Sequence, residues 1–142
     1  MNKFNKIVVA LDKSKSAYHA VNYAIEFAKL INAKIEIISI IEYEVGNIDA
    51  GIWPSEIEKK NALYIKGLIG EIVKEHPKST IEYFETKGIA EKEIIKAIKE
   101  WKADLLIIGH HTHSLLERLF VNSIEKKLIN HLECPLLIIP EK

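Results

Sequence analysis

The sequence predicts an α/β fold: a five-stranded, parallel, doubly wound sheet of order 3-2-1-4-5 with helices on both faces. Aliphatic runs such as 7–11 and 105–108 have no polar face, which is typical of strands buried on both sides. Segments with the helical period separate these runs, and this alternation requires parallel strands joined by right-handed crossovers. The 142 residues suffice for a substantial core, and we expect one domain, residues 1–142.

Strands are expected at five places along the chain. Segment 34–41 alternates and then becomes wholly apolar, as in a strand that enters the interior of a sheet. Segment 80–86 is shorter and half-alternating, so it is expected near a sheet edge. The first, fourth and fifth strands are expected at 7–11, 104–109 and 136–139.

Helices are expected between these strands. Ser14 or Ser16 can cap the first helix, which is expected to end at Asn32. Ser55 and Glu58 have the spacing of a capping box, so the second helix is expected to begin there and to end just before a proline. The remaining helices are expected at 90–101 and from 122 onward.

The charge balance and the cysteine content exclude several classes of partner. Twenty Lys and Arg residues balance twenty Asp and Glu residues, so no basic excess favours nucleic acid or an acidic membrane. No apolar run is long enough to span a bilayer, and the N-terminal residues lack the apolar core of a signal peptide. The single cysteine, Cys134, is expected to be a buried small residue in a reducing compartment. We therefore expect a cytoplasmic protein that binds neither nucleic acid nor membrane.

A binding crevice is expected where the strand order reverses, between the first and fourth strands. Open α/β sheets bind ligands at the carboxyl ends of the strands at this point. Asp12 follows the first strand and Gly109 ends the fourth, so both are expected at this edge. A loop then leads to a helix start at Asn122 and Ser123, where free N–H groups favour anions.

Several features recur together along the chain. They are Asp12 after the first strand, the alanine-spaced first helix, and the segments 86–90, 104–109 and 134–139. In this combination the chain resembles the universal stress protein family over essentially its whole length. The resemblance implies the adenine-nucleotide alpha-hydrolase-like fold, usually dimeric, and a stress-response or regulatory role. One branch of the family binds ATP through Gly-x2-Gly-x9-Gly-Ser/Thr, and another lacks this motif and does not bind nucleotide tightly.

The ATP motif is matched here only in part. Gly109 supplies the first glycine and Ser123 the hydroxyl residue, whereas Thr112 and Asn122 replace the second and third glycines. Asn tolerates a left-handed backbone, but a β-branched Thr would be strained there and would crowd a phosphate. Two interpretations therefore stay open: an ATP site, with Mg, or a nucleotide-independent dimeric interaction module.

If ATP binds, the resemblance implies a role for each matching position. Asp12, with the backbone of Ala10 and Leu11, would meet the ribose or adenine end, and Ile40 would flank the base. The phosphates would be cradled after the fourth strand and received at the helix start. The positions implied there are Ile108, Gly109, His111, Thr112, Asn122, Ser123 and Ile124.

The loop after the fourth strand is rich in histidine. His110, His111 and His113 could bind a transition metal or pair with phosphate, but no Asp or Cys is adjacent, so a solvated loop is favoured and no metal site is expected. No nucleophile is paired with a general base, so we expect no enzyme; slow ATP hydrolysis would require His111 or His113 to position water. Trp53, on the long loop 42–54, would either shield a base or close the core, and the second is favoured.

The last strand predicts a partner. It is uniformly aliphatic between Pro135 and Pro140, and it is expected at a sheet edge. An exposed apolar edge invites pairing, and a second copy related by a two-fold axis would protect it. We expect a homodimer through this strand, as the family resemblance also implies.

Overall fold

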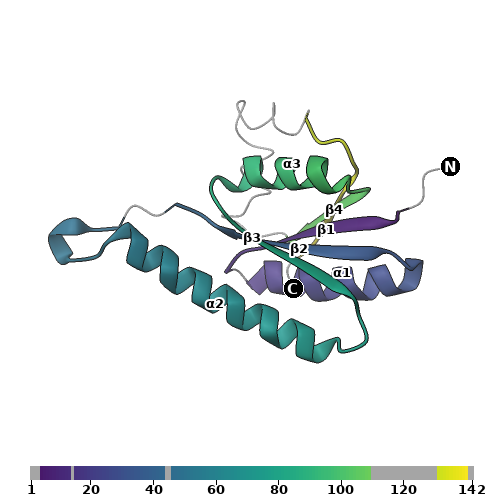
Figure 1. Ribbon diagram of the computed structural model, residues 1–142, viewed down its shortest axis with the longest axis horizontal. Helices are drawn as coiled ribbons and strands as arrows, with labels where there is room; N and C mark the ends of the chain where they lie inside the picture. The colour runs from purple at the N-terminus through teal and green to yellow at the C-terminus, as the bar shows by residue number, and fades with distance from the viewer. Residues whose placement is uncertain (1–3, 14, 44–45, 110–130, 141–142) are drawn as a thin grey trace.

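The computed structural model describes residues 4–13, 15–43, 46–109 and 131–140, without the side chain of Ser16. The elements follow in the order β1 (Lys6–Leu11), α1 (Lys15–Ile31), β2 (Lys34–Ile41), the 3-10 turn η1 (Ile48–Ala50), α2 (Pro54–Glu75), β3 (Ile81–Lys87), α3 (Ala90–Trp101), β4 (Leu105–Gly109) and β5 (Leu136–Ile139). The strands form one sheet of order β3-β2-β1-β4-β5, and every pair is parallel. The predicted fold class and strand order are confirmed (Figure 1).

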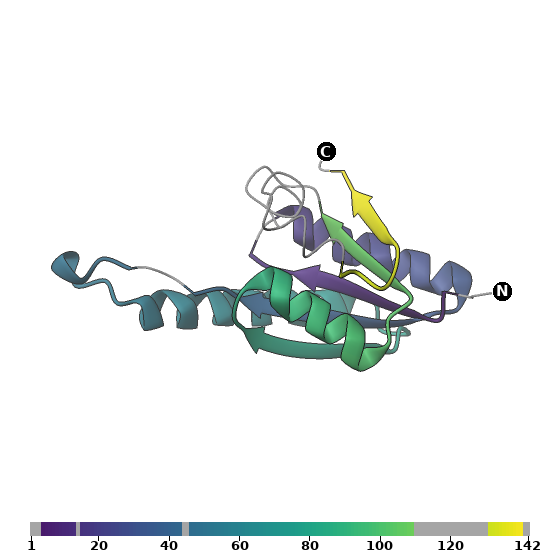
Figure 2. The ribbon, with the colours of Figure 1, turned by 90° about the horizontal axis from the view of Figure 1, so that it is seen from above.

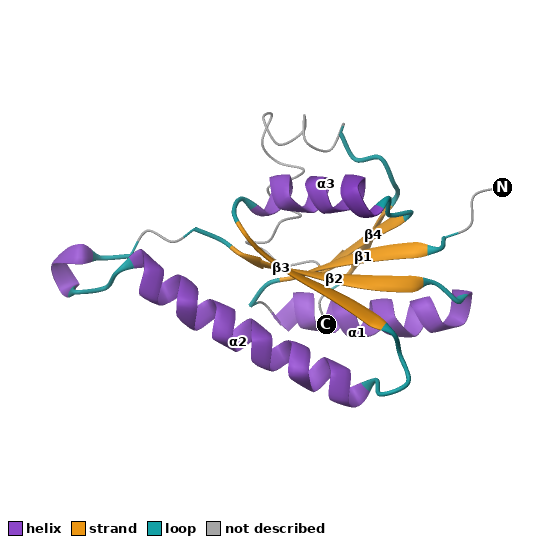
Figure 3. Ribbon diagram, viewed as in Figure 1, coloured by secondary structure: helices purple, strands orange, loops and turns teal. Residues whose placement is uncertain are grey.

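Helices cover both faces of the sheet. The helices α1 and α2 lie on one face and α3 on the other (Figures 2 and 3). Because side chains alternate along a strand, Val9 and Leu11 of β1 pack in the cluster that contains α1 and α2, whereas Val8 and Ala10 pack in the cluster that contains α3. The two apolar layers explain why the central strands lack a polar face.

The strands β1 and β4 are neighbours at the centre, and β3 and β5 form the two edges. The edge position of β3 was predicted from its half-alternating sequence, and most of its residues are exposed. In β5, Leu136, Leu137 and Ile138 are partly buried and Ile139 is buried. The winding reverses between β1 and β4, as the strand order requires.

Polar groups join the strands at the amino edge of the sheet. One carboxylate oxygen of Asp104 accepts the backbone N–H groups of Asn5 and Lys6, at 2.9 and 3.0 Å. The Asp104 N–H donates in turn to the Lys6 carbonyl at 2.8 Å, and the Lys34 N–H donates to the Asn5 carbonyl at 2.8 Å. The Lys6 ammonium lies 5.5 Å from the centre of the Trp101 ring. These contacts fix the start of β1 against β2 and β4.

The helix ends agree with the prediction except at the start of α2. Helix α1 stops before Asn32, whose φ of 56° is left-handed, and α2 stops before His76. Ser16 lies inside α1, so it is not the cap, and Ser14 lies outside the described residues. The predicted capping box is wrong, because Pro54 opens α2 and the preceding residue makes no side-chain cap. A proline is well suited to the first helical position because its missing N–H has no partner there in any case.

The long loop between β2 and α2 does not close the core. Its residues 47–52 form a small hairpin with η1 at its tip, which extends away from the sheet (Figure 1). Trp53 leaves 49% of its surface exposed, so the expectation that it closes the core is wrong. The loop holds its shape by local bonds: the Ala50 N–H donates to the Asn47 side chain, and Gly51 adopts a left-handed φ of 74°. None of the described helices is long and apolar enough to cross a membrane.

Candidate functional site

The expected site lies at the carboxyl edge of β1 and β4. Val9 pairs with Ile107, so the parallel register brings Ala10 level with Ile108, and Leu11 level with Gly109. Asp12 follows directly after β1 on the same edge. The structure thus brings together the part of the predicted site that the first and fourth strands supply.

The end of β2 belongs to the same edge. Leu11 pairs with Ser39 of β2, so Asp12 and Ile40 are both one residue beyond the last pair and lie at one level. Ile40 pairs in turn with Thr86 of β3. The edge therefore presents Asp12, Ile40 and Thr86 in a row across three parallel strands.

Buried apolar residues lie in the strands beside the one carboxylate of this row. Ala10, Ile40 and Ile108 are buried and pack in the cluster beneath α3. Asp12 is only partly buried, so its carboxylate can reach solvent or a ligand at the edge. An apolar wall beside a single polar acceptor suits a flat, partly apolar ligand that carries hydroxyl or amino donors.

The phosphate half of the predicted site cannot be placed in the same way. His111, Thr112, Asn122, Ser123 and Ile124 lie outside the described residues. His110 and His113 lie there too, as does the start of the predicted fourth helix. Among the described residues, no group of three or more His, Cys, Asp or Glu side chains is arranged to hold a metal ion.

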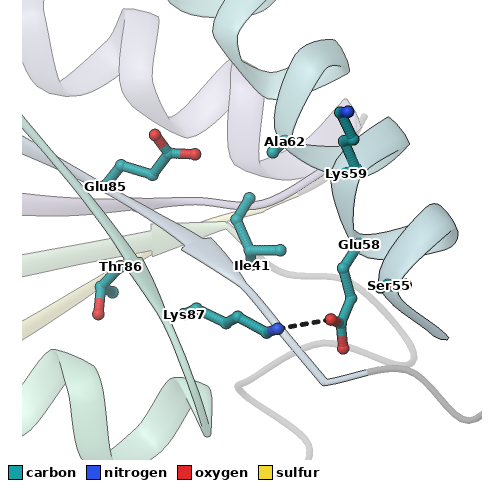
Figure 4. Close-up of a pocket in the computed structure, with 8 residues that line it drawn as sticks. All are labelled: Ile41, Ser55, Glu58, Lys59, Ala62, Glu85, Thr86 and Lys87. Atoms are coloured by element: carbon teal, nitrogen blue, oxygen red, sulfur yellow. Dashed lines mark ion pairs between the residues drawn. The ribbon is translucent and has the colours of Figure 1, made fainter.

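A cavity of about 420 Å³ opens beside this edge, between the end of β3 and the first turns of α2 (Figure 4). Its lining residues come from β2, β3 and α2 and include both apolar and charged side chains. They are Ile41, Ser55, Glu58, Lys59, Ala62, Glu85, Thr86 and Lys87. In Figure 4 the side chains of Glu58 and Lys87 point toward each other across one end of the cavity.

The contact between Glu58 and Lys87 is the main feature of this region that the local sequence pattern missed. The Lys87 ammonium lies 2.6 Å from the Glu58 carboxylate, and the glutamate side chain is only 9% exposed. Lys87 also lies 5.5 Å from the centre of the Tyr43 ring. Glu58 therefore does not act as the second half of a capping box. It ties α2 to the end of β3, and the 29 positions that separate the two residues hide this pairing from any local motif.

The turn after β3 is held by two further bonds. The Gly88 N–H donates to the Ile41 carbonyl at 3.1 Å, and the Thr86 hydroxyl donates to the Glu93 carboxylate at 2.7 Å. Gly88 has a φ of 158°, and an added Cβ would meet the Glu93 side chain at 3.1 Å. The segment 86–90, which the family resemblance singled out, thus connects the ends of β2 and β3 to the start of α3.

Cys134 sits apart from this edge, just before β5. It is partly buried against the cluster beneath α3, in line with the expectation of a small packing residue. Burial raises the pKa of its thiol above the usual 9.0, and the nearby Asp104 carboxylate adds to the effect. A thiol with a raised pKa is a poor nucleophile at neutral pH.

Comparison with known proteins agrees with this architecture. A universal stress protein of Methanocaldococcus jannaschii is 28% identical over 143 residues, covering 97% of this chain and 83% of the relative. A universal stress protein of Synechocystis is 26% identical and covers 96% of this chain and 97% of the relative. Among solved structures, the universal stress protein UspA of Lactobacillus plantarum superposes with a TM-score of 0.77 at 18% identity, covering 98% of this chain and 99% of that one.

Two further solved neighbours hold nucleotides. A universal stress protein in complex with cAMP has a TM-score of 0.59 at 24% identity, covering 97% of this chain and 98% of that one. A universal stress protein family member of Arabidopsis thaliana with AMP bound has a TM-score of 0.65 at 16% identity, covering 97% of this chain and 92% of that one. The model of the universal stress protein family matches residues 3–140. This chain therefore belongs to the universal stress protein family.

Proposed function

We propose that this protein binds an adenine nucleotide, ATP with Mg²⁺, at the carboxyl ends of β1 and β4, and that it acts in the cytoplasm as a dimeric stress-response regulator and not as an enzyme. The observation that carries the proposal is the reversal of winding at β1 and β4, with Asp12 and Gly109 brought to one edge. Family members solved with cAMP and with AMP support the choice of ligand.

The residues at the described half of this edge fit the base and the ribose. Ala10, Ile40 and Ile108 form an apolar wall on which a purine can rest, and the Asp12 carboxylate can accept hydrogen bonds from ribose hydroxyl groups. The backbone of Leu11 borders the same edge. Bound Mg²⁺ would neutralise part of the phosphate charge.

The phosphate half of the proposal rests on the motif positions in the sequence. Gly109 and the backbone amides at His111 and Thr112 would face the phosphates, and Asn122, Ser123 and Ile124 would receive them at a helix start.

The nucleotide site is tested by isothermal titration of ATP and Mg²⁺ into the wild type and an Asp12→Ala variant. A lost hydrogen bond to a charged acceptor is worth about 1.5–3 kcal/mol, so we expect the variant to bind about 10- to 150-fold more weakly. Asp49→Ala is the matched control, because Asp49 is exposed on η1, away from this edge. Equal affinity of all three proteins would refute the assignment of Asp12, and no heat at millimolar ATP would refute the site.

The proposed dimer uses the outer edge of β5, which pairs with no further strand among the described residues. The Leu106 N–H of β4 donates to the Pro135 carbonyl. In a parallel ladder of this register, the next hydrogen bond between the two strands runs from the Leu137 N–H to β4. The N–H groups of Leu136 and Ile138 therefore point away from β4, toward the open side of the sheet. A second copy can pair with these outward groups across a two-fold axis.

This edge is tested by measuring the molar mass in solution for Ile138→Pro and Ile138→Val. Proline removes an outward N–H without removing a bond to β4, so we expect it to shift the protein from dimer to monomer. Valine keeps the N–H and loses one methylene of packing, so this variant should stay dimeric. A dimeric proline variant would show that β5 is not the contact.

The competing function is a dimeric interaction module that binds no nucleotide. The substitution of two motif glycines by Thr112 and Asn122 favours it. The two functions are separated by titrating ATP into the wild type and into a variant with Thr112→Gly and Asn122→Gly. Binding by the wild type supports the nucleotide function, whereas binding by the double variant alone supports the interaction module.

A further inference from the structure

The helix α2 carries an exposed seam that the described part of the chain does not use. The seam residues recur at spacings of four, three, four, three and four, and all of them are exposed: Glu56, Lys60, Leu63, Gly67, Gly70 and Lys74. The opposite side of α2 buries Ile65, Ile69 and Ile72. Figure 1 shows α2 as an outer element of the molecule, beneath the edge of the sheet formed by β3 and β2. A spacing that averages 3.5 residues is the pattern with which helices pair along their length.

The seam and its flanks expose apolar surface that the described residues leave uncovered. Leu63 leaves 64% of its surface open to solvent, and its neighbour Tyr64 leaves 54% open. Val73, near the other end of the helix, leaves 51% open. Single exposed apolar residues are ordinary on protein surfaces, but here one of them lies on the same line as two glycines.

The two glycines lower the stability of α2 without serving its packing. A glycine inside a helix is about 1 kcal/mol less favourable than alanine. A Cβ built on Gly67 or on Gly70 would meet no described atom within 4 Å, so neither glycine is needed to fit α2 against the described part of the chain. What their absent side chains do provide is room on the outer surface, where a second helix can approach closely.

The seam matches itself when it is read in the opposite direction. In an antiparallel pair with a two-fold axis near residue 65, facing residue numbers add up to 130. Glu56 then faces Lys74 of the second copy, and Leu63 faces the gap at Gly67. The aliphatic part of the Lys60 side chain then crosses Gly70 of the second copy, and its ammonium reaches Glu71 of that copy. Opposite charges and large against small residues thus meet at every position, and the symmetry makes each contact twice.

From this match we infer that α2 is a contact surface for a second copy of this chain, which binds through the same helix in antiparallel orientation. The contact is distinct from the proposed β5 dimer and does not depend on nucleotide. One helix pair is smaller than the interface of about 1,200–2,000 Å² that holds a stable complex. The association through α2 is therefore weak and reversible. It adds a second, concentration-dependent association step to the proposed β5 dimer.

The contact is tested by sedimentation velocity of the full chain from low micromolar to millimolar concentration. We expect the mass of the wild type to rise with concentration. Lys60→Glu should weaken this step about ten-fold or more, because it places like charges together at two symmetric positions. Lys60→Glu combined with Glu71→Lys should restore it, because both pairs are then opposite in charge again. Both residues are exposed, so the fold tolerates either change.

A second pair of variants separates the contact from a general effect on the helix. Gly67→Ala should raise the melting temperature at low concentration by favouring α2, and it should weaken association at high concentration by pushing Leu63 outward. Leu63→Ser should weaken association, whereas Leu30→Ser on α1, where the leucine is 85% exposed, should not. A wild-type mass that does not change with concentration would overturn the inference. Failure of the charge swap to restore association would overturn it as well.

Discussion

The substitution Asp104→Ala tests whether the amino edge of the sheet holds β1 in register with β4. Asp104 accepts two backbone N–H groups through a single carboxylate oxygen, from Asn5 at 2.9 Å and from Lys6 at 3.0 Å. The bond to Lys6 is partly buried, whereas the bond to Asn5 is exposed and can be replaced by water. The alanine variant therefore loses one hydrogen bond that contributes fully to the free energy of unfolding and one that contributes little.

The expected loss is about 2 kcal/mol, because a hydrogen bond to a charged group contributes about 1.5–3 kcal/mol and an exposed one contributes little. For a chain of this length, that corresponds to a fall of about 4–8 °C in melting temperature. Asp104→Asn is the matched control. Its amide oxygen can still accept both N–H groups without the charge, so we expect a loss of about 1 kcal/mol or less.

The measurement is urea unfolding of the three proteins at one pH, followed by circular dichroism. If the alanine variant loses less than about 0.5 kcal/mol, the two bonds do not stabilise the register, and the reasoning fails. An asparagine variant as unstable as the alanine variant would show that charge, and not the hydrogen bonds, is what matters. Because Asp104 lies at the amino edge, neither variant should change nucleotide affinity by more than about two-fold.

Three other predictions concern burial and charge. Burial, together with Glu82 opposite it on β3, raises the pKa of Glu36 above its usual 4.5, so Glu36 weakens the fold as pH rises from 4.5 through that raised value. Glu36→Gln should therefore match the wild type near pH 4 and exceed it by about 0.5 kcal/mol at pH 7 in thermal melts, and a difference that stays constant over this pH range would contradict the raised pKa. The raised pKa of Cys134 should make its alkylation at pH 8 at least several-fold slower in the folded protein than in urea, and equal rates would contradict its burial. Ile107→Ala, at a fully buried position of β4, should cost about 2–5 kcal/mol in urea unfolding, and a loss below 1 kcal/mol would place β4 outside the core.

The fold could be predicted from the sequence because its signals are local and repeated. Strands β1 and β4 are aliphatic on both faces, and only a sheet covered by helices on both sides buries such strands. The alternation of strand and helix patterns then forces parallel pairing, which leaves few strand orders open. Helix ends at Asn32 and before Pro77 follow from backbone preferences that a single residue sets.

The start of α2 was predicted wrongly because it depends on a contact between residues that are far apart in the sequence. Ser55 and Glu58 have the spacing of a capping box, but Glu58 turns inward to Lys87, which the fold brings from the end of β3. A burial-driven pairing between two elements that are distant in the sequence leaves no trace in a four-residue motif. Trp53 was misjudged because an ordinary connection over the core was expected, whereas the loop forms the hairpin 47–52 and leaves Trp53 half exposed.

The two edges of the sheet at β1 differ: contacts between strands hold the amino edge, and the carboxyl edge carries the residues proposed to bind nucleotide. At the amino edge, backbone groups of Asn5 and Lys6 bond to β2 and to Asp104, so the start of β1 is fixed by contacts between strands. At the carboxyl edge, Asp12 and Ile40 follow strand residues already aligned by that register. The positions of Asp12 and Ile40 thus follow from the sheet, whereas most of the residues proposed to meet the phosphates follow β4 in the sequence. Variants should divide in the same way: Asp104→Ala should change stability and leave affinity nearly unaltered, and Asp12→Ala should change affinity more than stability.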